Sequence, residues 1–173
     1  MRWIFLLFFL TALGGMAFAL YLQYVEFLEP CNLCILQRVA LIYIGIIGLL
    51  AWLHSPGHVG NKIYAFLGLL GAGAGVGVAG RHVWLQNLPP DKVPECGPSL
   101  DFLMEAMPLQ DALMTVFKGS GSCADIDMTF YGYTIPEMTL AMFAGVGILL
   151  VMMLLWPAPK RRVTIQSDDS APE

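Results

Sequence analysis

Charged residues are scarce in this sequence. Asp, Glu, Lys and Arg make up 13% of its 173 residues, against roughly 25% in soluble domains. With 57% hydrophobic residues, the chain is excluded from the soluble globular class and falls into the membrane class. Basic residues form no patch that would bind nucleic acid, and the net charge is −4. A Cys-x-x-Cys-His motif is absent too, which excludes that mode of haem attachment.

Long apolar runs are the main feature of the sequence. Four of them are long enough to cross about 30 Å of hydrocarbon, which takes roughly 20 residues in a helix. They run from about 3 to 22, 33 to 53, 63 to 80 and 138 to 156. We therefore predict an all-α fold, an integral membrane four-helix bundle over residues 1–162 surrounded by membrane lipids, with loops at about 23–32 and 82–137. The polar tail 163–173 is predicted to be disordered.

The first apolar run has a second interpretation. Arg2 precedes it and Ala17-Phe18-Ala19 lies near its end, a pattern that is also typical of a cleaved secretory signal. However, the positive region holds a single Arg, and the sequence stays uncharged to Val25, past the expected cleavage point. We therefore expect this segment to be retained as the first membrane helix.

The distribution of Lys and Arg predicts the orientation in the membrane. With four spans, both termini and the second connection share one side of the membrane. That side receives five basic residues, Arg2, Lys62, Lys160, Arg161 and Arg162. Basic residues close to helix ends mark the cytoplasmic side, and three of the five directly follow the last span. Both termini are therefore expected inside the cell, with the large loop and most acidic residues outside.

All four cysteines fall on the predicted outer side. Cys31 and Cys34 lie at the start of the second span, and Cys96 and Cys123 lie in the large loop. An oxidising outer compartment permits disulfides, so two cysteine pairs indicate disulfide chemistry. Inert structural disulfides and a zinc site are the alternatives at this point. Four-cysteine zinc sites usually combine two close pairs, whereas Cys96 and Cys123 are 27 positions apart.

The Cys31-Asn32-Leu33-Cys34 segment places two sulfur atoms close enough to cycle between a disulfide and a dithiol. Pro30 suits a helix start, where unpaired backbone N–H groups favour a thiolate. Arg38 shares a helix face with Cys34 because the two are four positions apart. Its guanidinium is a candidate to stabilise that thiolate and to bind a carbonyl oxygen that gains negative charge. The alternative is that Arg38 extends to lipid phosphates.

The loop pair is predicted to meet a protein partner. Cys123 follows Gly119-Ser120-Gly121-Ser122, which has little conformational preference, and Cys96 lies in a turn-rich segment that keeps it exposed. Exposure and mobility make a disulfide easy for an incoming thiolate to attack. At the outer end of the third span, His82 is either an interfacial anchor or a contact of the electron acceptor.

Part of the sequence resembles a known family. The segment from Glu29 to Arg38 reads Glu-Pro-Cys-Asn-Leu-Cys-Ile-Leu-Gln-Arg, and Gly121-Ser122-Cys123-Ala124 precedes an aromatic run and Pro136. Together they resemble the bacterial disulfide bond formation protein B (DsbB) family, over about residues 1 to 160. The resemblance implies a four-helix bundle in the bacterial inner membrane that reoxidises a periplasmic thioredoxin-like carrier of the DsbA type. It also implies that electrons pass to a quinone, either ubiquinone or menaquinone.

The resemblance further implies roles for individual residues. Cys96 pairs transiently with a cysteine of the carrier. Cys123 then leaves and attacks the other pair at Cys31, which gives an interloop disulfide and makes Cys34 the thiolate that faces the quinone. The quinone-binding residues that the resemblance implies are Cys34, Arg38 and His82.

Two other classes of protein remain as alternatives. One is a quinone-linked thiol oxidoreductase similar to the vitamin K epoxide reductase-like enzymes, which also carry Cys-x-x-Cys in a four-helix bundle. In those enzymes the motif usually lies late in the chain, whereas here it lies at the second span. The other is a non-enzymatic membrane scaffold with two structural disulfides. The scaffold predicts that Cys34→Ser lowers stability without any change in thiol oxidation.

Overall fold

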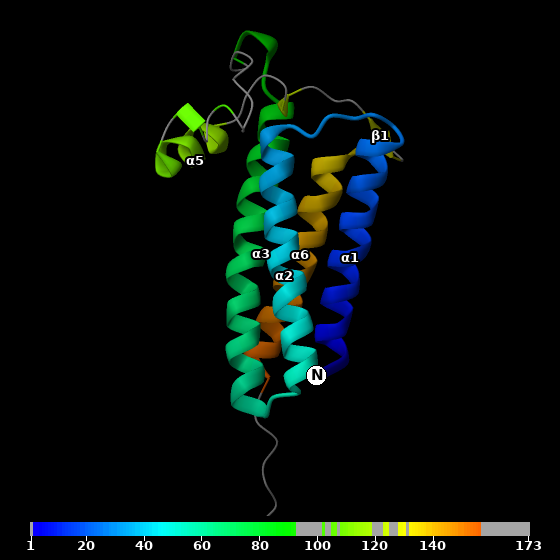
Figure 1. Cartoon of the computed structure of the whole chain (residues 1–173), viewed down its shortest axis with the longest axis vertical. Helices are drawn as coiled ribbons and strands as arrows, with labels where there is room; N and C mark the ends of the chain where they lie inside the picture. The colour runs from blue at the N-terminus through cyan, green and yellow to red at the C-terminus, as the bar shows by residue number, and fades with distance from the viewer. Residues whose placement is uncertain are drawn as a thin grey trace, which may run out of the picture.

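A computed structural model describes residues 2–92, 102, 105–106, 108–118, 123–124, 128–130 and 132–156. Four long helices run up and down along the long axis (Figure 1), α1 (Arg2–Tyr24), α2 (Asn32–His54), α3 (His58–Gln86) and α6 (Ile135–Leu155). Shorter elements gather at one end of the bundle, η1 (Pro90–Lys92), α5 (Leu109–Lys118), β1 (Thr129–Phe130) and β2 (Tyr133–Thr134). Cys96, the basic cluster at 160–162 and the tail 163–173 lie outside the described residues.

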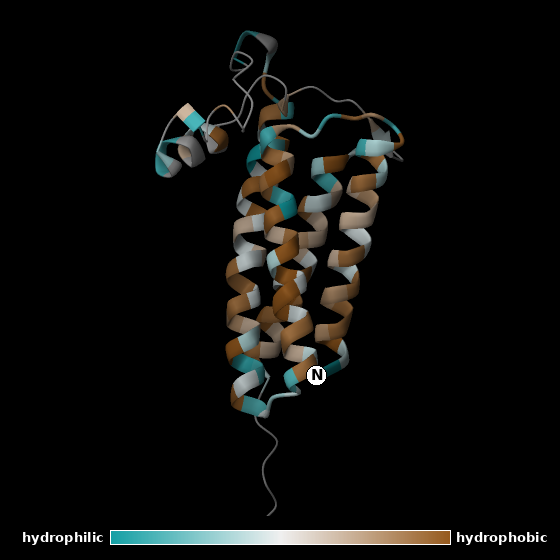
Figure 2. Cartoon of the chain, viewed as in Figure 1, coloured by the Kyte–Doolittle hydropathy of each residue, from teal (hydrophilic) through white to brown (hydrophobic). Residues whose placement is uncertain are grey.

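In the part of the chain that the structure describes, four helices are long and apolar enough to cross a membrane. They contain 21 to 29 residues each, which corresponds to about 32 to 44 Å at roughly 1.5 Å per residue. Figure 2 shows hydrophobic residues along most of their length and hydrophilic residues near both ends. The predicted all-α membrane bundle with four spans is confirmed.

The third helix is longer than its apolar run. α3 continues to Gln86, beyond the expected end of the span near residue 80. His82 therefore lies within a helix and not in the loop that follows the span. Arg81 and His82 lower the local hydropathy and so end the apolar run, but a polar side chain does not by itself end a helix.

Two helices begin at the end of the bundle that carries the short elements. Cys31 precedes α2 with extended backbone angles, φ −67° and ψ 164°, as expected of a helix-capping residue. Thr134 precedes α6 in the same way, and its N–H donates a hydrogen bond of 2.8 Å to Glu137 Oε2. The antiparallel pair β1–β2 leads directly into this start. These two capping residues determine where along the chain α2 and α6 begin.

Each long helix packs mainly against its neighbour in the chain, α1 on α2, α2 on α3 and α3 on α6. Contact between α1 and α6 is sparse among the described residues. The core lies along the well-packed seams, and its large buried side chains include Phe5, Phe8, Ile44, Phe143 and Leu150. The side of the bundle between α1 and α6 is therefore the least tightly closed.

Gly75 lets α3 approach α6 closely. A Cβ atom at this position would lie 2.6 Å from Phe143 Cδ1, which is closer than real side chains approach. We expect Gly75→Ala to lower the free energy of unfolding by about 1–3 kcal/mol, because the buried Phe143 ring must move. Gly77→Ala is the matched control, since a Cβ there meets nothing within 4 Å. Unfolding in mixed detergent micelles measures both variants, and equal stabilities would contradict the close α3–α6 packing.

Candidate redox site

Cys31 and Cys34 stand at the N-terminus of α2 with their sulfur atoms side by side. Cys31 Sγ accepts a hydrogen bond of 3.4 Å from the backbone N–H of Cys34 and so caps the helix. The two sulfur atoms are 3.1 Å apart and are not bonded to each other. Because a disulfide bond measures about 2.05 Å, a small side-chain rotation brings the two sulfur atoms to bonding distance, and loss of two electrons and two protons then converts the dithiol into a disulfide. The pair can therefore take up and release two electrons.

His82, near the end of α3, lies against both sulfur atoms. Its side chain is buried, with 3% of its surface exposed. Its Nε2 atom is 3.8 Å from Cys31 Sγ, and its Nδ1 atom is 4.0 Å from Cys34 Sγ. Each ring nitrogen of His82 therefore lies beside one sulfur atom of the cysteine pair.

Two further hydrogen bonds link His82 to α6. Gln37 Nε2 is 3.1 Å from His82 Nδ1, and Thr139 Oγ1 donates a bond of 2.7 Å to Gln37 Oε1. With the amide donating to Nδ1, the ring proton sits on Nε2 and faces Cys31. Neither Gln37 nor Thr139 is among the predicted site residues. A Gln inside an apolar span, three positions after Cys34, is the sequence signal that could have identified the first of them.

Thr139→Val tests whether this hydrogen-bond chain contributes to stability. Valine keeps the shape of threonine but leaves the oxygen of buried Gln37 without its hydroxyl donor. We expect the free energy of unfolding to fall by about 1–3 kcal/mol, the usual cost of an unsatisfied buried polar group. Thr139→Ser retains the hydroxyl and serves as the control, with an expected loss of less than about 1 kcal/mol for one methyl group. If the two variants are equally stable, the hydrogen bond from the Thr139 hydroxyl to Gln37 contributes nothing to the free energy of unfolding.

Arg38 is held inside the protein by α1. Its Nη1 atom donates to Gln23 Oε1 over 2.5 Å, and its Nη2 atom donates to the carbonyl oxygen of Ala19 over 3.2 Å. The half-buried guanidinium therefore crosses the seam between α1 and α2 instead of extending away from the bundle. This arrangement fixes a positive charge one helical turn from Cys34. Gln23 is a third site residue, after Gln37 and Thr139, that the sequence prediction did not include.

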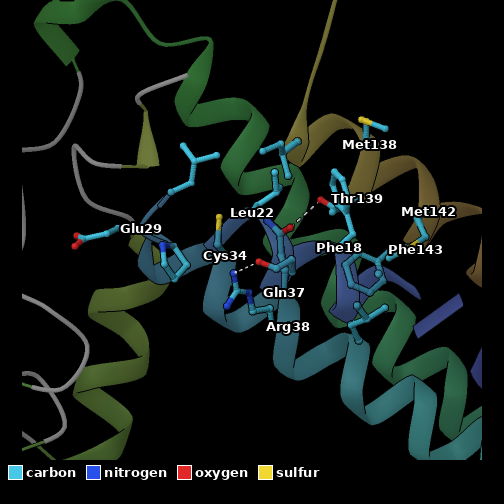
Figure 3. A pocket seen from close by; sticks show the side chains of 16 residues that line it. Phe18, Leu22, Glu29, Cys34, Gln37, Arg38, Met138, Thr139, Met142 and Phe143 are labelled. Atoms are coloured by element: carbon cyan, nitrogen blue, oxygen red, sulfur yellow. Dashed lines mark hydrogen bonds between the residues drawn. The ribbon is translucent and has the colours of Figure 1, made fainter. Parts of the chain in front are cut away.

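A cavity of about 350 Å³ lies between α1, α2 and α6, beside Cys34 and Arg38 (Figure 3). The volume falls within the range of about 300–1,000 Å³ that is typical of small-molecule sites. The polar side chains in its wall include those of Cys34, Gln37, Arg38 and Thr139. Most of the wall is apolar and includes Phe18, Leu22, Leu41, Met138, Met142 and Phe143. The cavity therefore suits a largely apolar molecule with a few polar atoms at the Cys34–Arg38 end.

Cys123 is not among the residues that line this cavity. Its side chain is fully buried and packs with Leu33 and Leu85, and Cys31 borders the same cluster. The expectation that the loop pair is exposed is therefore wrong for Cys123. The Gly-Ser composition of the preceding residues does not predict this environment, because a thiol behaves as a small apolar group and gains from burial between α2 and α3.

The structure brings most of the predicted site residues to one end of the bundle. Cys31, Cys34 and His82 form one contact group, and Arg38 lines the neighbouring cavity with Cys34. His82 is not among the residues that line the cavity, so its contact with the electron acceptor stays a prediction. Cys96 lies outside the described residues.

Comparison with known proteins identifies the family of this chain. The family model described as "Disulfide bond formation protein DsbB" matches residues 1–153. The chain is 50% identical over 148 residues to Disulfide bond formation protein B of Acinetobacter baumannii, covering 85% of this chain and 84% of the relative. It is 52% identical over 149 residues to the Nitrosococcus oceani protein of that name, and the match covers 86% of this chain and 88% of that relative. For the Marinobacter nauticus protein of that name the identity is 46% over 154 residues, and the match covers 89% of this chain and 92% of that relative.

The family match spans α1, α2, α3 and all but the last two residues of α6, and it includes both cysteines at the start of α2. A multi-pass membrane protein with a dithiol that can close to a disulfide has the features of a disulfide-forming oxidoreductase. The chain therefore belongs to the DsbB family of disulfide bond formation proteins.

Proposed function

We propose that this protein is a protein-disulfide:quinone oxidoreductase that moves two electrons from a periplasmic DsbA-like dithiol carrier to a membrane quinone, either ubiquinone or menaquinone. The observation that carries the proposal is the cavity beside Cys34 and Arg38. It lies among helices that are apolar enough to cross a membrane, and its walls are mostly apolar. A lipid-soluble acceptor reaches such a site, whereas a water-soluble one has no comparable path.

Electrons move through two cysteine pairs in this proposal. A thiolate of the carrier attacks Cys96 and releases Cys123, which attacks Cys31 and releases Cys34 as a thiolate. In the full cycle the carrier dithiol is oxidised to a disulfide, and all four cysteines return to their disulfides. The quinone takes two electrons and two protons and becomes a quinol. The balance needs no metal and no other oxidant.

The position of Cys123 supports exchange between the pairs. Thiol–disulfide exchange requires direct approach of a thiolate to a disulfide sulfur. Cys123 packs with Leu33 of α2, and Cys31 borders the cluster that these residues form. The cluster keeps the Cys123 side chain at the N-terminus of α2, where attack on Cys31 is needed.

Arg38 and the cavity walls suit the head group of a quinone. The guanidinium donates hydrogen bonds in a fixed plane, and a carbonyl oxygen that gains negative charge on reduction accepts them. Phe18, Met142 and Phe143 offer flat or adaptable apolar surfaces for a ring. The sparse contact between α1 and α6 gives a lateral route from the bilayer. When bound, the quinone supplies a two-electron acceptor next to Cys34.

The same proposal fixes the orientation in the membrane. The cysteine pair and the short elements lie at one end of the bundle, opposite the connection between α2 and α3 (Figure 1). Lys62 near that connection and the basic residues at 160–162 favour the cytoplasm for the other end. The cysteines of an inner-membrane protein then face the oxidising periplasm, where the carrier is found.

Ala19→Phe tests the assignment of the cavity. Ala19 lines the cavity from α1, so a phenyl ring at this position occupies space beside Arg38. We expect the KM for a soluble ubiquinone analogue to rise at least about tenfold, which equals roughly 1.4 kcal/mol of binding. Ala17→Phe places the same ring on an exposed position of α1 and is the matched control.

Exchange of disulfides between Cys96 and the carrier should be the same in both variants, because the proposed exchange does not involve the quinone. Quinone reduction is followed by absorbance and exchange by trapping the mixed disulfide. An unchanged KM in Ala19→Phe would place the quinone elsewhere.

A further inference from the structure

Three potential metal ligands meet at the N-terminus of α2. Cys31 Sγ, Cys34 Sγ and a ring nitrogen of His82 all lie within 4.8 Å of one another. Two thiolates and one imidazole form a ligand set that Zn²⁺ uses in proteins, with a fourth position left for water. This group differs from the four-cysteine site considered from the sequence, because it uses neither loop cysteine and gains a histidine from α3.

The distances suit a tetrahedral Zn²⁺ after one adjustment. With a Zn–N bond of about 2.1 Å and Zn–S bonds of about 2.3 Å, neighbouring ligand atoms lie about 3.6 Å (N to S) and 3.8 Å (S to S) apart. Cys31 Sγ is 3.8 Å from His82 Nε2, whereas the two sulfur atoms are 3.1 Å apart. Rotation of the Cys31 side chain, which precedes the helix, widens the gap between the sulfur atoms.

The surroundings of His82 can support the tautomer that binds a metal. A metal on Nε2 requires the ring proton on Nδ1. If the Gln37 amide turns over, its oxygen accepts that proton across the same 3.1 Å contact. Thr139 Oγ1 then accepts from the amide nitrogen and donates its own hydrogen to the carbonyl oxygen of Pro136, 3.0 Å away. Gln37 thus provides the hydrogen bond that a metal-bound histidine normally makes through its other nitrogen.

We propose that the reduced form of this site binds one Zn²⁺ through Cys31, Cys34 and His82, and that the bound ion blocks electron transfer out of the cysteine pair. Binding replaces two S–H bonds by two Zn–S bonds and releases two protons, with no change in oxidation state. The disulfide form has no thiolate ligands, so only the dithiol form binds the ion tightly. The ion must then leave before the two sulfur atoms can form a disulfide. The inhibition rests on the function proposed above, whereas the binding does not.

Binding is tested on the full-length protein in detergent, with Co²⁺ as a coloured probe and Zn²⁺ as its competitor. The reduced protein, freed of reductant, should develop thiolate-to-cobalt absorption that saturates at one Co²⁺ per chain. One equivalent of Zn²⁺ should abolish the absorption. Protein with both cysteine pairs oxidised should show none. The absence of absorption from the reduced protein, or equal absorption in both redox states, would overturn the proposal.

Variants locate the ion. The double variant Cys96→Ser, Cys123→Ser should keep one Co²⁺ per chain, and loss of binding in it would assign the ion to the loop cysteines and overturn the proposal. His82→Ala should lower the affinity for Zn²⁺ by more than about a hundredfold, and Gln37→Leu by about ten- to a hundredfold. His54→Ala, at the opposite end of α2, is the matched control and should leave the affinity unchanged. Equal affinities in His82→Ala and His54→Ala would remove histidine from the ligand set.

Inhibition is measured separately, as the rate at which a soluble ubiquinone analogue oxidises the pre-reduced protein. Stoichiometric Zn²⁺ should slow this rate at least about tenfold, because the dithiol is sequestered, and a chelator should restore it. An unchanged rate in protein that has bound Co²⁺ or Zn²⁺ would overturn the inhibition and leave the binding standing. No oxidation by quinone in metal-free protein would overturn the proposed function, and the inhibition with it.

Discussion

Replacing Cys34 by serine is expected to lower the rate of quinone reduction at least about a thousandfold, as the loss of a reacting sulfur does in enzymes. Cys34 is the sulfur atom that lines the cavity, next to Arg38. Serine matches the shape of the thiol but cannot form a disulfide or give up electrons. The measurement is the loss of quinone absorbance in the presence of a reduced DsbA-like carrier.

The first half of the pathway should survive in the same variant. Cys96 and Cys123 are unchanged, so one disulfide per protein should still pass to the carrier before turnover stops. Detection of this single exchange would show that the variant is folded and that only electron transfer from Cys34 to the quinone is blocked. Thiol oxidation at the wild-type rate in Cys34→Ser would favour the scaffold alternative, in which the cysteines are structural.

Replacing Arg38 by methionine is expected to lower quinone reduction by about a hundred- to a thousandfold, the usual cost of removing one donor to a developing negative charge. Methionine retains much of the length of arginine and its contact with the apolar cavity wall. It removes the bonds to Gln23 and Ala19 as well as the charge beside Cys34. Exchange with the carrier should be unaffected, because Arg38 takes no part in it.

Arg81→Met is the matched control for the charge. Arg81 lies in the same end of the bundle on α3, where its guanidinium stacks 4.2 Å from the centre of the Trp84 ring. It is not among the residues that line the cavity. We expect quinone reduction within about threefold of wild type, as for surface changes worth less than roughly 0.5 kcal/mol. Equal losses in both variants would show that general basic charge, and not Arg38, is needed.

Much of the fold follows from the sequence because membrane spans are read from hydropathy alone. The four long helices and the cysteine pair at the start of α2 required no knowledge of tertiary contacts. The end of α3 did not follow, since Arg81 and His82 lower the local hydropathy while the helix continues to Gln86. Hydropathy predicts which residues lie in the hydrocarbon region, whereas a helix can continue beyond the edge of that region.

The contacts within the site depend on packing and were only partly predictable. Arg38 was identified because it lies one helical turn from Cys34. The bond between Gln37 and His82 joins residues 45 positions apart, and that between Gln37 and Thr139 joins residues 102 apart. Such partners are fixed by how α2, α3 and α6 face one another. The burial of Cys123 likewise depends on Leu33 and Leu85, which lie on other elements.

In the proposed function, two electrons pass from carrier thiols through the cysteine pairs to a quinone in the membrane. The most direct test mixes the purified wild-type protein with a reduced DsbA-like carrier and a soluble ubiquinone or menaquinone analogue, and follows carrier thiols and quinone absorbance together. One carrier disulfide is expected for each quinone reduced. Carrier oxidation without loss of either quinone, or no oxidation with either one, would contradict it.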